Sequence, residues 1–119
     1  MKRALVLSGG GSKGAYQAGA IKYLVGSKRI HYDILCGVSV GALNAATLAL
    51  YARGQEPEAV QDMLKIWNNI STSGVRRSWK PFGYLHVLWK PSVYDSQPLI
   101  DFVREKFDIE KIRASEKKL

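Results

Sequence analysis

Two short apolar runs, each followed by a glycine-containing turn and a helix-forming segment, constrain the fold of this chain most strongly. The run at residues 4–8 leads into a glycine-rich turn at 9–14 and a helix predicted at about 15–25. The run at 32–37 leads into a second turn at 37–41 and a helix predicted to reach residue 51. A strand–helix–strand–helix order favours a parallel sheet with right-handed crossovers. The sequence therefore predicts an α/β fold.

Beyond residue 51 the pattern predicts two further helices and one long excursion. Pro57 stands in the first turn of a third helix, where the spacing predicts a core-facing stripe of Val60, Met63, Leu64 and Trp67. From about 68 to 94 the periodicity is lost, which is typical of an extended excursion or lid. Residues 95–98 open a fourth helix, and another helical turn is expected from Ile109. The expected buried face of the fourth helix is Leu99, Ile100, Val103 and Phe107.

The length of 119 residues allows one domain, and no apolar run is long enough for a transmembrane helix. The apolar run after Met1-Lys2-Arg3 stops at Ser8, too early for a signal peptide. The single cysteine, Cys36, excludes an internal disulfide and suits a reducing compartment. Because Cys36 lies within an apolar run, we expect it to be a small buried hydrophobic residue. We expect a cytoplasmic protein.

Positive charge and tryptophan gather in one window of the chain, which has a net charge of +8. No acidic residue stands between Asp62 and Asp95, whereas five basic residues and all three tryptophans do. Such a window, about 65–94, could meet anionic lipid headgroups at a membrane surface. An ordinary solvated surface over core aromatic residues is the alternative. Nucleic acid is not expected, since no nucleic-acid-binding signature accompanies the charge.

The turn Gly37-Val38-Ser39-Val40-Gly41 has the pattern of a nucleophile elbow, G-x-S-x-G between a strand and a helix. In such an elbow the serine has a strained backbone, and the glycines allow the strand and the helix to approach closely. Ser39 is therefore the candidate nucleophile. The alternative is that Ser39 serves only as a helix N-cap.

The first turn matches G-x-G-x-x-G at Gly9, Gly11 and Gly14, a pattern that also occurs in dinucleotide-binding modules. A nucleotide site is disfavoured, since Ser39 rather than an acidic residue ends the second strand. A P-loop does not fit either, because Ala15 follows Gly14. In a parallel sheet both turns lie at one edge, so the N–H groups of a glycine-rich loop could face Ser39. We expect Gly10 and Gly11 to donate to a developing oxyanion.

Together, the segments 9–19 and 33–45 resemble the start of a patatin-like phospholipase domain, and the strong match covers about residues 3–50. Residues 94–99 resemble, more loosely, a helix start of bacterial members. The resemblance implies a three-layer α/β/α fold with a mainly parallel sheet, and hydrolysis of acyl esters in lipids, as by a phospholipase A. It also implies a Ser–Asp dyad without a metal or organic cofactor. Ser39 takes the place of the nucleophile, and Gly9, Gly10 and Gly11 take that of the oxyanion loop.

The chain departs from the family pattern at the general base. The family's aspartate stands in an Asp-Gly motif, but none of the five aspartates here is followed by glycine. We therefore expect the amino-terminal part of one patatin-like domain, in which a truncated sheet favours self-association. A catalytically silent fragment that binds lipid or protein is the alternative, because serine without a base is a weak nucleophile.

A base from within the chain is a further hypothesis. Ser39, Asp62 and His86 follow the chain order of an α/β-hydrolase triad. His31 precedes the second strand, so the length of that strand separates it from the elbow. We do not expect His31 to act on Ser39.

Overall fold

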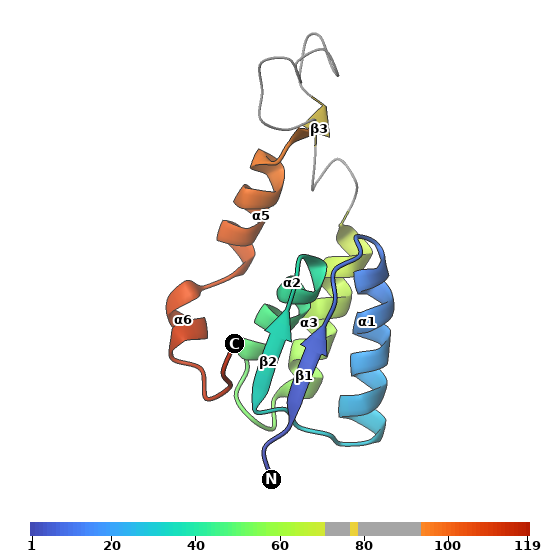
Figure 1. Cartoon of the computed structure of the whole chain (residues 1–119), viewed down its shortest axis with the longest axis vertical. Helices are drawn as coiled ribbons and strands as arrows, with labels where there is room; N and C mark the ends of the chain where they lie inside the picture. The colour runs from blue at the N-terminus through green and yellow to red at the C-terminus, as the bar shows by residue number, and fades with distance from the viewer. Residues whose placement is uncertain (71–76, 79–93) are drawn as a thin grey trace. The chain divides into compact units, whose positions relative to one another are not determined.

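The structure, a computed structural model, describes residues 1–70, 77–78 and 94–119. It divides into two compact units, one formed by Met1–Asn69 with Phe107–Leu119 and the other by Ile70–Lys106. The elements of the first unit, in chain order, are β1 (Ala4–Leu7), α1 (Lys13–Lys22), the π-helical segment η1 (Tyr23–Ser27), β2 (Ile34–Gly37), α2 (Val40–Ala49), α3 (Glu56–Asn69) and α6 (Ile109–Arg113) (Figure 1).

Strands β1 and β2 form a parallel pair, in register from Ala4 opposite Ile34 to Leu7 opposite Gly37 (Figure 1). On its other side, Ile34 forms a parallel bridge with Lys118. The N–H of Leu35 donates to the carbonyl of Lys118 at 2.7 Å. The predicted α/β architecture with a parallel sheet is confirmed, and β2 lies between β1 and Lys118.

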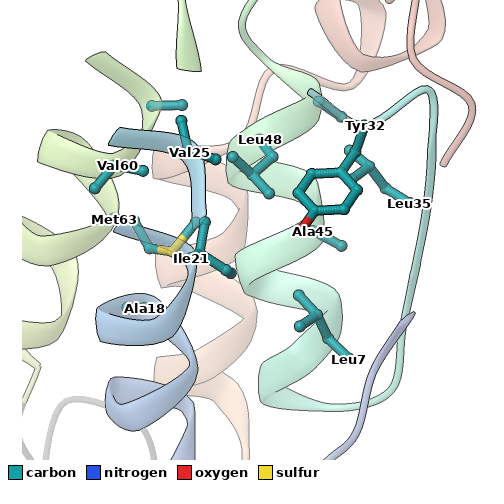
Figure 2. Close-up of a cluster of buried hydrophobic side chains, with 12 residues drawn as sticks. Leu7, Ala18, Ile21, Val25, Tyr32, Leu35, Ala45, Leu48, Val60 and Met63 are labelled. Atoms are coloured by element: carbon teal, nitrogen blue, oxygen red, sulfur yellow. The ribbon is translucent and has the colours of Figure 1, made fainter. Parts of the chain in front are cut away.

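The hydrophobic core lies between the helices and one face of this sheet. Helix α2 packs against both strands, and α1 and α3 pack against α2 and against each other. Figure 2 shows side chains from all of these elements in one cluster; the labelled ones are Leu7, Ala18, Ile21, Val25, Tyr32, Leu35, Ala45, Leu48, Val60 and Met63. Burial of a large aliphatic side chain contributes about 1.5–3 kcal/mol, so this cluster supplies the main driving force for folding the unit.

The predicted stripe on the third helix is confirmed in α3. Val60 and Met63 are buried, and Leu64 and Trp67 pack half-buried against the same cluster. Pro57 occupies the second position of α3, where the missing N–H costs no helical hydrogen bond. The apolar spacing alone therefore identified the face that meets α1 and α2.

The expectation that Cys36 is buried is wrong, because Cys36 is exposed. Side chains alternate between the two faces of a strand. Leu35 points into the core and is 1% exposed, so its neighbour Cys36 lies on the opposite face. Val6 is 75% exposed for the same reason, although it stands in an apolar run. Among the described residues, only one face of the sheet carries a packed core.

The second unit contains β3 (Arg77–Ser78), paired antiparallel with β4 (Tyr94–Asp95), and the helix α5 (Gln97–Lys106). The predicted helix after residue 96 is confirmed, but its predicted buried face is not. No residue of α5 is fully buried, and Ile100 is 43% exposed. Phe107 is buried, but it follows the helix and belongs to the first unit. An amphipathic pattern predicts which face of a helix is apolar, but it does not predict whether that face is buried.

Most of the basic and aromatic window at 65–94 lies outside the described residues, as does His86. None of the helices in the described ranges is both long enough and apolar enough to cross a membrane.

Candidate active site

Ser39 stands between the end of β2 and the first residue of α2, in a backbone conformation that L-residues rarely adopt. Its φ and ψ are 55° and −124°. A backbone of this kind costs about 1–3 kcal/mol and persists only where the surroundings impose it. Ser39 is exposed, and its hydroxyl makes no capping hydrogen bond within the part of the chain that the structure describes. Helix capping therefore does not explain the serine.

The flanking glycines are required by the close approach of three chain segments. A Cβ on Gly37 would lie 2.4 Å from the carbonyl oxygen of Gly41. A Cβ on Gly41 would lie 2.4 Å from the carbonyl oxygen of Leu7. Both distances are far below van der Waals contact, so neither position has room for a side chain. The elbow is held against the end of β1 by these contacts.

The glycine-rich loop lies directly beside Ser39. A Cβ built on Gly9 would meet the Cβ of Ser39 at 3.2 Å and the carbonyl oxygen of Val38 at 3.4 Å. Gly10 and Gly11 have positive φ values of 146° and 57°, which glycine adopts at little cost. The structure therefore brings the two predicted turns together at one edge of the sheet.

The loop leaves several backbone donors open as it turns into α1. The N–H groups of Lys13 and Gly14 donate to the carbonyls of Gly10 and Gly11, at 3.2 and 3.0 Å. The N–H groups of Gly9, Gly10 and Gly11 have no acceptor among the described residues. Unpaired N–H groups at the start of a helix favour negative charge. This is the chemistry that an oxyanion hole requires.

Val40 is a further candidate that the sequence reasoning did not single out. It is the first residue of α2, so its N–H has no partner within the helix. In nucleophile elbows the N–H after the serine commonly belongs to the oxyanion hole. This general rule about the residue after the serine would have identified Val40 from the sequence.

A buried amide also escaped the sequence reasoning. Asn44 is 1% exposed in α2 and hydrogen-bonds to Gln17 of α1 and Trp67 of α3. The available signal was an amide side chain in a helix that is otherwise apolar except for Thr47.

Each aspartate whose side chain is described is engaged by a group other than Ser39. Asp33 accepts from the N–H of Arg3 at 2.8 Å and pairs with Arg53. Asp101 accepts from Gln97 at 2.8 Å.

Asp62 and Asp108, the other two aspartates with described side chains, are also hydrogen-bonded to groups other than Ser39. Asp62 accepts from the hydroxyl of Tyr51 and from Lys65, and these bonds lower the pKa of its carboxyl. Asp108 caps α6 by accepting from the N–H of Lys111 at 3.1 Å. Within the described ranges, no base is hydrogen-bonded to Ser39.

His31 lies in a separate buried network. Its Nδ1 is 3.1 Å from Oε2 of Glu56, a carboxylate that is 1% exposed. Burial by itself would raise the pKa of Glu56. Hydrogen bonds from its own N–H and that of Gly54, the charge of Lys117 and the contact with His31 more than offset that effect, so the pKa is lowered. This network connects the start of α3 with Lys117, and Ser39 takes no part in it.

A pocket of about 420 Å³ opens between η1 and the first half of α3. Its lining includes Tyr23, Val25, Pro57 and Val60 but neither Ser39 nor the glycine loop. The pocket is therefore separate from the candidate active site.

The fold and the site define the class as an α/β protein with a strained serine elbow beside a glycine-rich loop. A comparison with protein families matched residues 5–119 to the patatin-like phospholipase family. Neither the curated proteins nor the solved structures gave a match. The chain belongs to the patatin-like phospholipase family, whose members act on acyl esters of lipids.

Proposed function

We propose that this chain carries the nucleophile and the oxyanion hole of a patatin-type serine hydrolase that cleaves acyl esters of lipids, as a phospholipase A or lipid acyl hydrolase. One observation carries the proposal: an exposed serine with a φ of 55° packs against a glycine loop whose N–H groups are open among the described residues. A serine kept in a costly conformation is best explained by a demand on the position of its hydroxyl.

In the proposed reaction the hydroxyl oxygen of Ser39 attacks the acyl carbonyl, and negative charge develops on the carbonyl oxygen. The N–H groups of Gly9, Gly10 and Gly11 are proposed to stabilise this charge by donating hydrogen bonds to the carbonyl oxygen, with the N–H of Val40 as an additional donor. One such donor is worth about 2.7–4 kcal/mol of transition-state stabilisation. The positive end of the α2 dipole lies at the same place and acts in the same direction.

The general base is proposed to be an aspartate, as in a Ser–Asp dyad, that is not among the described side chains. The four described aspartates are held by other partners, as shown above. This observation also favours a second candidate function, a catalytically silent chain that binds lipid or protein. The two candidates differ in whether Ser39 turns over an ester. A nucleotide-binding module is not favoured, since Ser39 and no acidic residue stands in the turn that follows β2.

Hydrolysis of an activated acyl ester, such as a p-nitrophenyl acyl ester, tests the proposal. Serine without a base is a weak nucleophile, but the good leaving group of an activated ester lets it react slowly. We therefore expect slow turnover by the chain, which Ser39→Ala should reduce to the residual rate that an oxyanion hole and substrate binding leave without a nucleophile. Ser27→Ala changes another exposed serine and serves as the matched control. Equal rates for the chain and Ser39→Ala would contradict the proposal, and labelling of Ser39 without turnover would favour the silent chain.

A further inference from the structure

The glycine loop is tied to the rest of the first unit by a chain of side-chain amides. Gln17 of α1 donates from Nε2 to the carbonyl oxygen of Ser8 at 2.7 Å. Its Oε1 accepts from Nδ2 of Asn44 at 3.2 Å. The amide of Gln17 therefore connects the residue before the loop with the helix that follows Ser39.

Asn44 in turn is fixed from three sides. Its Nδ2 also donates to the carbonyl of Gly14 at 3.0 Å, and its Oδ1 accepts from Nε1 of Trp67 at 2.8 Å. Three of the four hydrogen-bonding positions of the Asn44 amide are thus used, in a site that is 1% exposed. Asn44 has little freedom to move, so it holds Gln17 in one orientation.

The bond to Ser8 has a direct consequence for Gly9. The carbonyl of Ser8 and the N–H of Gly9 belong to the same planar peptide group, in which they point in opposite directions. A hydrogen bond that fixes this carbonyl therefore fixes the direction of the N–H as well. Gly9 is the loop residue that packs against Ser39, so closely that a Cβ added to Gly9 would lie only 3.2 Å from that of Ser39.

We propose that Gln17 is a positioning residue, which, held by Asn44, keeps the N–H of Gly9 in one orientation beside Ser39. This inference rests on the proposed function, because it assigns Gly9 to the oxyanion hole. The hydrogen bonds of Gln17 go to Ser8 and Asn44, so its proposed effect on Ser39 acts through the Gly9 peptide. An ionised glutamate could not replace it, since a carboxylate only accepts hydrogen bonds and would face the Ser8 carbonyl with a like partial charge.

The test is the rate at which a fluorophosphonate labels Ser39 in the 119-residue chain. In Gln17→Met we expect labelling about 10-fold to 100-fold slower, because a displacement of about 1 Å in a reacting site costs up to this much. Gln61→Met, at an exposed position of α3, is the matched control and should keep the original rate. Gln17 is only half-buried, so both variants are expected to fold, which circular dichroism can check.

Gln17→Glu separates positioning from a general structural effect. At about pH 7 the introduced carboxyl is ionised and should slow labelling. As the pH falls toward about 5, a growing fraction is protonated and can donate to Ser8. The rate relative to the unmodified chain should then recover. A ratio independent of pH, or labelling of Gln17→Met at the original rate, would overturn the proposal.

A different outcome would mark failure of the proposed function itself, namely no labelling of Ser39 in the unmodified chain. In that case the positioning of the Gly9 peptide can be tested without labelling, by comparing the chemical shift of the Gly9 amide among the variants in ¹⁵N NMR spectra. A shift of this resonance in Gln17→Met but not in Gln61→Met would support the positioning of the loop. An unchanged resonance would overturn it.

Discussion

Ser39 and Gly14 show how single positions set the geometry of the candidate site. Ser39 adopts a φ of 55°, and the close contacts of Gly37 and Gly41 hold the chain in that conformation. Gly14 is buried where α1 begins, and a Cβ there would lie 2.2 Å from Cζ2 of Trp67. The loop between Gly9 and Gly14 is thus confined at both ends, by Ser39 at one and by Trp67 at the other.

Gly14→Ala should destabilise the fold, because the new methyl group must displace the Trp67 ring. Overpacking of this kind costs about 1–3 kcal/mol. Gly19→Ala is the matched control on the same helix, since a Cβ at Gly19 meets nothing within 4 Å. It should stabilise the protein by about 0.5–1 kcal/mol, the usual difference between glycine and alanine in a helix. Urea unfolding of both variants measures the difference, and equal midpoints would contradict the packing described for Gly14.

Single residues also show what the sequence could and could not predict. Ser39 and the loop at 9–14 could be assigned to the same edge because parallel strands end together. The contact between Gly9 and Ser39 could not be predicted, since it depends on the path of the loop. The burial predicted for Cys36 was wrong, because an apolar run does not reveal which face of a strand has a packing partner.

At the scale of elements, α2 is the centre of the first unit. It contacts both strands as well as α1 and α3, and Asn44 provides its polar link to the two helices. Just beyond its end, Tyr51 donates a hydrogen bond to Asp62 of α3. That bond, together with burial and the charges of Asp62 and Glu58, raises the pKa of Tyr51 to about 12.

The Tyr51–Asp62 bond should make stability fall at high pH. The folded-state pKa of Tyr51 lies above the unfolded value of about 10, so its contribution is complete below pH ~10 and is lost as the pH rises toward 12. Tyr51→Phe should therefore reduce the urea midpoint at pH ~8 and make a smaller difference at pH ~11. Tyr16→Phe, at an exposed position, controls for loss of a hydroxyl. A difference between Tyr51→Phe and the unmodified chain that did not shrink with pH would contradict the assigned bond.

Helices with strong periodicity were the most predictable elements. The stripe of Val60 and Met63 determined both the existence of α3 and its buried face. The π-helical turn of η1 was not predicted, because the sequence at Tyr23–Ser27 continues the pattern of an ordinary helix end. For α5 the pattern predicted the helix correctly but not its burial, because Ile100 of the expected buried face is exposed.

At the scale of the whole molecule, one buried lysine connects the last residues of the chain with the helices. Lys117 is 5% exposed and donates to the carbonyls of Leu48 and Tyr51, at 3.2 and 2.6 Å. Its Nζ also lies 3.4 Å from Oε1 of Glu56. The lysine thus satisfies carbonyls at the end of α2 and balances a buried carboxylate at the start of α3. The adjacent Lys118 forms the bridge to β2.

Lys117→Met should destabilise the protein strongly, since it leaves the Glu56 carboxylate buried without its cation. Breaking a buried ion pair from one side costs about 3–5 kcal/mol, a large share of the stability of a small domain. Adding Glu56→Gln should recover part of this loss, because the uncompensated charge is removed. Lys118→Met, at the exposed neighbouring lysine, is the control and should have little effect. Similar unfolding midpoints for the two single variants would contradict the anchoring role of Lys117.

The central claim concerns Ser39, and covalent labelling followed by peptide mapping tests it most directly. The folded 119-residue chain is treated with a fluorophosphonate, and the modified residue is identified by mass spectrometry. The account predicts modification at Ser39 in preference to other exposed serines such as Ser12 and Ser27, and its loss when the chain is unfolded in urea. Absence of label on Ser39, or labelling that persists equally in urea, would contradict the account.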